Sequence, residues 1–160
     1  MVLGAAGAAP EEGAQVEAGK QNSKHSPIID AIAFAEAGTT GEVRVHISRR
    51  WFEKDPYSRA EKLFKRFGMW RTANRNAVLL YVNLRRHKFA VVGDEGIHKA
   101  LGQEYWNSLS HALSEDLKKM APEKAIAVAV VTIGETLKKF FPAEESPVNP
   151  DELSNDVTED

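Results

Sequence analysis

Two adjacent carboxylates in a glycine-flanked corner, Gly93-Asp94-Glu95-Gly96, are the residues of this sequence best suited to chemistry. They follow a predicted strand and precede a predicted helix, so the strand end would aim both side chains while the glycines let the backbone turn sharply. Glu42, at the start of another predicted strand, is expected to meet Asp94 and Glu95 at one edge of a sheet. Because hard divalent cations prefer several oxygen ligands, these three carboxylates predict a site for Ca²⁺ or Mg²⁺.

The same corner has a structural interpretation with equal support, in which Asp94 simply caps the helix that follows it. His98 lies three residues after Glu95, and a histidine beside carboxylates can act as an acid or base near neutral pH. Asp94, Glu95 and His98 are therefore the candidate catalytic residues. Lone histidines of this kind are more often surface or packing residues, and the chain has no P-loop, EF-hand or Asp-x-Asp signature.

The net charge of −2 conceals a strong separation of charge along the chain. Residues 21–142 hold 20 Lys and Arg against 13 Asp and Glu, whereas residues 143–160 hold seven acids and no base. A basic surface of this kind can bind phosphate groups, anionic lipid or a membrane-associated protein partner, and Trp51 and Trp70 among the cations would suit a membrane interface. The competing interpretation, a solvated face neutralised by the acidic tail, is favoured over binding. The candidate anion-binding residues are Arg71, Arg75, Arg85 and Arg86.

Composition excludes several classes of function. The absence of cysteine excludes disulfides, thiolate metal sites and cysteine nucleophiles. No apolar run is long enough to cross a membrane, and the first residues lack the cationic region of a signal peptide, so a cytoplasmic location is expected. Nucleic acid ranks low as a partner because no nucleic-acid-binding module is present.

The elements that would position these residues follow from hydrophobic periodicity and helix-capping signals. Strict alternation predicts a strand at 42–48, and two apolar runs joined by a basic turn predict a hairpin of strands 77–84 and 88–92. Helices are expected at 27–37, 56–67, 104–120 and 122–140, with a short helical turn at 97–101. In the 104–120 helix, the expected core contacts are Tyr105, Leu109, Ala112 and Leu117.

This order of elements predicts a single-domain α/β/α sandwich, in which a small mixed sheet, made of a βαβ unit and a β-hairpin, is flanked by helices. The domain is expected over 25–142. Residues 1–24, with almost no large apolar side chain, and the acidic tail 143–160 are expected to be disordered.

Several segments, in their order and spacing, resemble the TPM domain family over about residues 26–142. They are residues 31–41 leading into GEVRVHIS, the EKLF of residues 61–64, the RNAVLLYV strand and the KFAVVGDEGIH corner. The resemblance implies an α/β/α sandwich and a family in which some members bind calcium or a similar cation and some show weak acid-phosphatase activity. Others are accessory proteins of membrane complexes. Many relatives carry a signal peptide and a C-terminal membrane span, which are missing here, and their usual Asn-Gly before the central strand is Asn76-Ala77.

Overall fold

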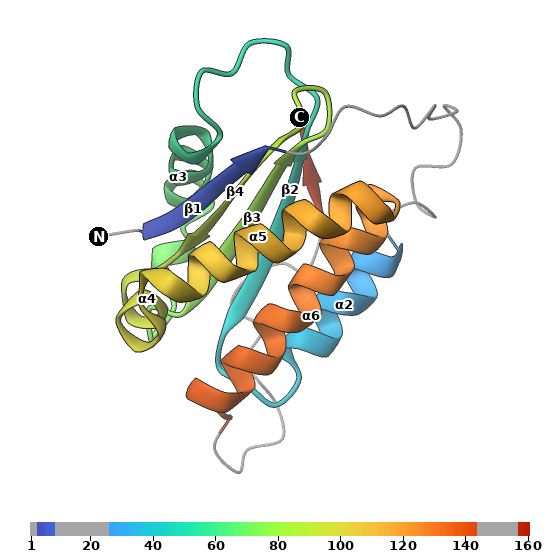
Figure 1. The fold of residues 1–160 in the computed structure, drawn as a ribbon. Helices are drawn as coiled ribbons and strands as arrows, with labels where there is room; N and C mark the ends of the chain where they lie inside the picture. Colours follow the sequence, from blue (N-terminus) through green and yellow to red (C-terminus); the bar gives the residue numbers. More distant parts are fainter. Residues whose placement is uncertain (1–2, 9–25, 144–156) are drawn as a thin grey trace.

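The computed structural model describes residues 3–8, 26–143 and 157–160. Its sheet has the strand order β1-β4-β3-β2-β5 and is mixed (Figure 1). β2 runs parallel to β3 and β5, whereas β4 runs antiparallel to β3 and β1. The strands are β1 (Leu3–Ala8), β2 (Glu42–Ser48), β3 (Ala77–Asn83), β4 (Lys88–Gly93) and β5 (Thr158–Glu159).

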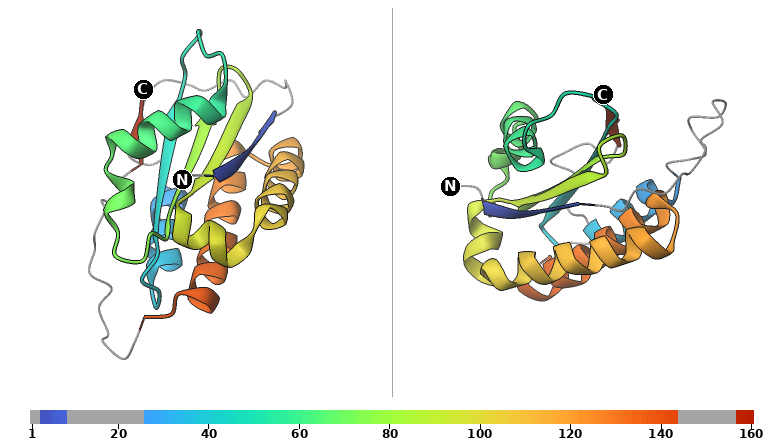
Figure 2. Two further views of the ribbon diagram at one scale, coloured as in Figure 1. Left: turned by 90° about the vertical axis from the view of Figure 1, so that its left-hand side faces the viewer. Right: turned by 45° about the horizontal axis from the view of Figure 1, so that its top comes forward.

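Helices cover both faces of this sheet (Figure 2). α3 (Pro56–Arg66) lies alone on one face, where Ala60 and Phe64 form a small core with Leu79, Tyr81 and Val92. The other face carries the larger core and the remaining long helices, which are α2 (Ser26–Glu36), α5 (Gln103–Lys119) and α6 (Pro122–Phe140). The α/β/α sandwich predicted from the sequence is confirmed.

The β2–α3–β3 unit follows from local chemistry. Asp55 accepts hydrogen bonds from the backbone N–H groups of Tyr57 and Ser58, and Pro56 occupies the first helical position, so α3 begins where the sequence predicts. A helix between two strands of one sheet is the connection that parallel pairing requires, and β2 and β3 are paired in register from Glu42↔Ala77 to Ser48↔Asn83.

Two segments at the ends of the chain differ from the predicted disorder. Residues 3–8 form the edge strand β1, and residues 158–159 form β5 at the opposite edge, beside β2. The backbone of each segment pairs with a strand edge that would otherwise be unpaired, which composition alone does not reveal. The remaining residues of the two predicted disordered ends, apart from Ala143, lie outside the described part of the chain.

Of the core contacts predicted for α5, Leu109 is buried, Tyr105 and Leu117 are partly buried against the core, and the prediction for Ala112 is wrong. Trp106, Leu109 and Leu113 are buried, whereas Ala112 is exposed. The buried face therefore follows the largest side chain, Trp106, which packs against the backbone of Gly93 at the end of β4.

Candidate functional site

The acidic corner connects β4 to the short helix α4 (Glu95–Leu101). Asp94 is completely buried and caps α4, since its Oδ1 accepts a hydrogen bond of 2.8 Å from the N–H of Glu95. Both of its oxygens also pair with Arg75, from Nε at 2.7 Å to Oδ2 and from Nη2 at 2.9 Å to Oδ1. Asp94 is thus the cap that the sequence allowed and, in addition, half of a two-point ion pair that the sequence did not predict.

Arg75 joins this corner to the loop that precedes β3. Its backbone adopts a left-handed φ of 49°, and its carbonyl accepts hydrogen bonds from the N–H groups of Gly96 (2.8 Å) and Ile97 (3.2 Å). The hydrogen bonds to Asp94 raise the pKa of the Arg75 guanidinium. A side chain at Gly96 would overlap the carbonyl of Asn74, so glycine is required where corner and loop meet.

Glu42 and Asp94 flank Ala77 at the same end of the sheet. Glu42 is fully buried and pairs in register with Ala77, whose carbonyl accepts from the N–H of Asp94 at 3.0 Å. Between them in sequence, Asn76 is also fully buried: its Nδ2 donates to Thr40 Oγ1, and its Oδ1 has no hydrogen-bond donor among the described residues. The structure therefore places Glu42 and Asp94, two of the three predicted metal-binding carboxylates, at the same end of the sheet.

The other two predicted catalytic residues, Glu95 and His98, lie on α4. Glu95 is 60% exposed, and its carboxylate lies 3.9 Å from the Arg75 guanidinium. His98, on α4, accepts a hydrogen bond of 3.1 Å at Nδ1 from the indole of Trp106. Within the described residues, no group of three or more acidic or histidine side chains is placed to hold a metal ion.

The four candidate anion-binding arginines are divided between the two ends of β3. Arg71, at the end of the 3₁₀ helix η1 (Met69–Arg71), and Arg75 precede the strand, whereas Arg85 and Arg86 lie in the turn after it. Arg71 stacks on Trp70, and Arg75 is engaged by Asp94. The four therefore do not form one site.

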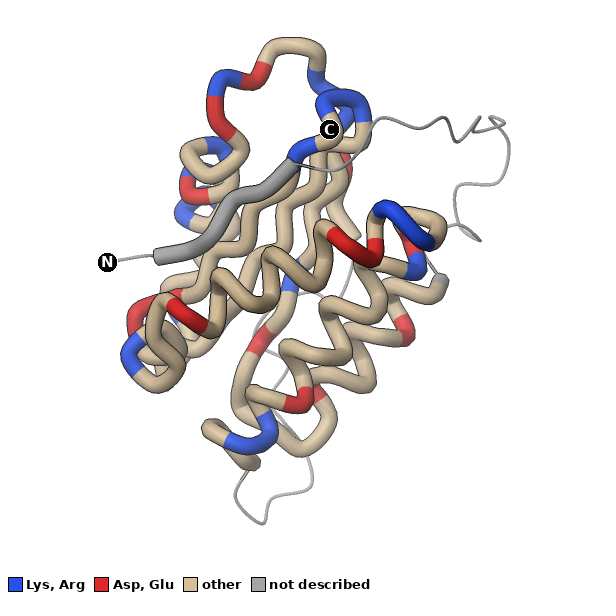
Figure 3. Tube along the Cα trace, viewed as in Figure 1, with Lys and Arg blue, Asp and Glu red and all other residues tan. Residues whose placement is uncertain are grey.

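The end of the sheet that carries Arg85 and Arg86 also presents two exposed aromatic side chains. Residues 49–55, which we call the aromatic loop, carry Trp51 (59% exposed) and Phe52 (94% exposed). Arg85 stacks on Trp51, with its guanidinium carbon 3.5 Å from the ring centroid. The turn at 84–87, which we call the basic turn, thus lies directly against the aromatic loop, and Lys and Arg gather at this end of the molecule (Figure 3).

The base of the aromatic loop is fixed to β3. Glu53 accepts hydrogen bonds from the Tyr81 hydroxyl and from Asn83 Nδ2, the latter at 2.6 Å. Asn83 Nδ2 also donates to the carbonyl of Arg50 at 3.2 Å. Because anchors hold the loop on both sides of Trp51 and Phe52, the two aromatic side chains project from a defined backbone.

A second polar cluster, around His46, was missed by the sequence interpretation. His46 is buried on β2, stacks on Tyr81 and lies 3.2 Å from the carboxylate of Asp160, a residue of the acidic tail. Arg59 also pairs with Asp160, and Arg50 Nη1 lies 3.7 Å away. The opposite charges of the acidic tail and the basic face predicted that the two meet, as Asp160 does with Arg50 and Arg59, whereas the part played by His46 was not predicted.

The electrostatics of this cluster favour a carboxylate beside a mostly neutral imidazole. Burial lowers the pKa of His46, and this effect outweighs the opposing influence of Asp160. Burial alone would raise the pKa of Asp160, but hydrogen bonds from Ser48, Arg59 and His46 outweigh it and lower that pKa to about 2. The carboxylate of Asp160 is thus ionised at all physiological pH values.

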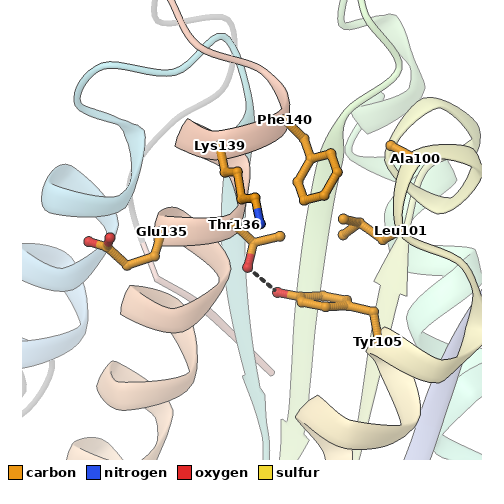
Figure 4. Close-up of a pocket in the computed structure, with 7 residues that line it drawn as sticks. All are labelled: Ala100, Leu101, Tyr105, Glu135, Thr136, Lys139 and Phe140. Atoms are coloured by element: carbon orange, nitrogen blue, oxygen red, sulfur yellow. Dashed lines mark hydrogen bonds between the residues drawn. The ribbon is translucent and has the colours of Figure 1, made fainter.

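A surface pocket lies elsewhere, between α4, α5 and the last turns of α6 (Figure 4). The Tyr105 hydroxyl donates to Thr136 at 3.1 Å there, and burial raises the pKa of Tyr105. The pocket is also lined by the apolar side chains of Leu101 and Phe140 and by the charged residues Glu135 and Lys139. None of the site residues predicted from the sequence lines this pocket.

The fold defines a class of protein, a small α/β/α module built on a mixed sheet. The family model described as the TPM domain matches residues 21–138, and the chain belongs to this family. Among the helices of the described residues, none combines the length and hydropathy that crossing a bilayer requires.

Two solved structures share the fold. The BA42 protein from the psychrophilic bacterium Bizionia argentinensis is 28% identical, with a TM-score of 0.80 over 91% of this chain and 99% of its own. The N-terminal domain of the cg2496 protein from Corynebacterium glutamicum is 12% identical, with a TM-score of 0.60 over 84% of this chain and 80% of its own. The second likeness concerns the fold alone. No curated protein matches the chain.

Proposed function

We propose that this TPM domain is a non-enzymatic docking module that binds anionic phospholipid surfaces through the aromatic loop and the basic turn. The observation that carries the proposal is the 94% exposure of Phe52, next to Trp51, on a loop anchored at both sides and flanked by arginines. An anchored loop holds this large aromatic side chain in water. Its transfer to an apolar medium is favourable, by about 1.5–3 kcal/mol if the side chain becomes fully buried.

The chemistry of this end matches that of a membrane interface. Tryptophan is enriched at the headgroup level of membranes, where its ring is partly apolar and partly hydrogen-bonded. Exposed cations near an anionic surface contribute about 1 kcal/mol each, and Arg85 and Arg86 are exposed in the basic turn. Because Arg85 stacks on Trp51, insertion of the indole would bring this guanidinium to the phosphate level.

The test is co-sedimentation of the full chain with phosphatidylcholine vesicles that contain or lack phosphatidylserine, at low and high ionic strength. We expect binding to the anionic vesicles that weakens as salt rises. Phe52→Ser should weaken it about tenfold and Arg86→Gln about fivefold, corresponding to losses of about 1.4 and 1 kcal/mol. The matched control is Phe34→Ser, since Phe34 is half exposed on α2. Equal recovery with both vesicles, insensitive to salt and to Phe52, would refute the proposal.

A second candidate function is divalent-cation binding at the edge formed by Glu42, Asn76 and Asp94, with weak metal-assisted phosphatase activity. The observation that favours it is the fully buried Oδ1 of Asn76, which lacks a donor among the described residues, at the end of the sheet where Glu42 and Asp94 are also buried. Carboxylate and amide oxygens are ligands that Ca²⁺ and Mg²⁺ accept, with waters completing the coordination. Glu42, Asp94 and the Oδ1 of Asn76 would hold such an ion, and the bound cation would supply charge stabilisation to a phosphate ester.

The protein's own ion pair opposes this site. Both oxygens of Asp94 are engaged by Arg75, so an ion that uses Asp94 has to compete with a guanidinium. We therefore expect weak binding, in the millimolar range typical of the least charged calcium sites. Glu95 and His98 remain candidates for proton transfer only if a substrate binds between α4 and the end of the sheet that carries Glu42 and Asp94.

Titration with Ca²⁺ or Mg²⁺, followed by amide NMR, tests this second function. Resonances of residues 93–96 and of Glu42 should shift at millimolar metal, and static resonances would rule the site out. A phosphatase assay with p-nitrophenyl phosphate should show a metal-dependent rate that Asp94→Asn abolishes. Asp116→Asn, which changes an acid on α5, is the control. Background rates in all three proteins would rule out this phosphatase activity.

A further inference from the structure

The last described residues of the chain bind to the outer edge of β2 as an added strand. Thr158 and Glu159 pair in parallel with His46 and Ile47 (Figure 1). The backbone contacts continue beyond the strand: Asp160 donates to the carbonyl of Ile47 at 3.1 Å, and Arg49 donates to the carbonyl of Asp160 at 3.0 Å. This is the geometry by which extended peptides add to an open sheet edge.

Alternate side chains of this segment contact opposite faces of the sheet. Val157 packs against the larger core, on the side of α2 and α6. Thr158 and Asp160 lie on the side of α3, where the Thr158 hydroxyl is 2.8 Å from Nδ1 of His46. Glu159 pairs with Arg49 at 3.3 Å. Each of the four residues therefore meets a group of matching chemistry.

The position of Asp160 is the most specific of these. Its carboxylate contacts Nε2 of His46 and the guanidinium groups of Arg50 and Arg59. The His46 ring is fixed by stacking on Tyr81, with ring centroids 5.7 Å apart and planes inclined by 8°. We call the edge of β2 at residues 46–49, together with Arg50 and Arg59, the β2-edge site.

We infer that the β2-edge site is a docking site for an acidic, extended peptide segment of a partner protein, which replaces the chain's own residues 157–160. The segment it would accept has an aliphatic residue, a hydroxyl residue and two acids in succession. The β2-edge site shares Arg49 and Arg50 with the aromatic loop, but its test differs from that of membrane docking because it uses the strand edge and Arg59 on α3.

The short length of the chain's own segment favours its exchange with another segment. β5 is two residues long, and its ion pairs with Arg49 and Arg50 are partly exposed, so each contributes less than about 1 kcal/mol. A tethered segment acts at an effective concentration of about the millimolar range. A partner segment of the same chemistry can therefore exchange with it when the partner is abundant or multivalent.

The experiment uses a labelled peptide as the probe and the full chain as the target. The peptide carries residues 157–160 behind two glycines, its N-terminal amine is blocked by the label and its C-terminus is amidated, so that neither terminus is charged. Fluorescence anisotropy should show weak binding to the wild type and about tenfold tighter binding to the double variant Glu159→Ala/Asp160→Ala, because a competitor at about millimolar effective concentration has been removed.

Two comparisons make the result specific. Arg59→Gln in the double-variant background should abolish most of the binding, whereas Lys62→Gln, the same charge change one turn later on α3, should leave it unchanged. A scrambled peptide, Asp-Val-Glu-Thr, has the same charge and should bind at least tenfold more weakly. Equal binding of the two peptides, equal binding to wild type and double variant, or no binding to either protein would overturn the inference.

Discussion

Asp94→Ala is expected to lower the free energy of unfolding by about 3 kcal/mol. The substitution removes the helix cap of α4, worth about 1 kcal/mol, and leaves Arg75 without the two hydrogen bonds to a buried carboxylate. Breaking a buried ion pair costs about 3–5 kcal/mol, but the Arg75 side chain is 40% exposed and regains hydration, which reduces this cost. Urea denaturation followed by circular dichroism measures the difference.

Three related variants divide this loss into its parts. Asp94→Asn keeps an oxygen that can cap α4 and should cost less than Asp94→Ala. Arg75→Ala leaves the buried carboxylate with the cap alone and should cost about 2 kcal/mol. The combined Arg75→Ala/Asp94→Ala variant should lose at least about 1 kcal/mol less than the sum, because the two residues interact directly. A loss below about 0.5 kcal/mol for Asp94→Ala would contradict this structural role and favour a carboxylate kept for function.

The part of the fold that could be predicted from the sequence is the part fixed by local patterns. The alternation of Val43, Val45 and Ile47 specifies a strand with one apolar face, and Asp55-Pro56 specifies where α3 begins. The apolar run of β3 indicates burial on both faces, and the two cores lie on those faces. These local patterns predict the βαβ unit and the hairpin. Together the two motifs predict a sheet covered by helices on both faces.

The candidate site was less predictable because its partners are distant in sequence. The carboxylate of Asp94 was identified, but its ion pair depends on the left-handed backbone of Arg75, which no residue type at that position signals. The Asn76-Ala77 step leaves Ala77 in regular β structure, and the left-handed residue is Arg75 instead.

The two edge strands show why terminal segments escape sequence patterns. β5 consists of a threonine and a glutamate, with neither the length nor the apolar alternation that predicts a strand. What holds Thr158 and Asp160 is His46, one residue of the polar face of β2, together with arginines from two other segments. Only the assembled sheet brings these groups together.

Trp106→Ala is expected to destabilise the protein at least as much as Asp94→Ala, with a loss of about 3–5 kcal/mol in the free energy of unfolding. Trp106 is completely buried, packs against Gly93 and meets the ring of Tyr105 edge-on, with centroids 5.1 Å apart. Its indole also donates to His98, so the side chain joins α5 to β4 and α4 at once. Since Gly93 has no side chain to fill the space, truncation leaves a cavity that the sheet cannot close.

Trp106→Phe separates the effect of side-chain volume from that of the hydrogen bond. It keeps most of the ring against Gly93 and loses the bond to His98, so a cost of about 1–2 kcal/mol is expected. Leu117→Ala, a truncation on the partly buried last turns of the same helix, is the control and should cost less than Trp106→Ala. Thermal and urea denaturation of the three variants provide the measurement. If Trp106→Ala and Leu117→Ala cost the same, the packing of α5 does not depend on the contact between Trp106 and Gly93.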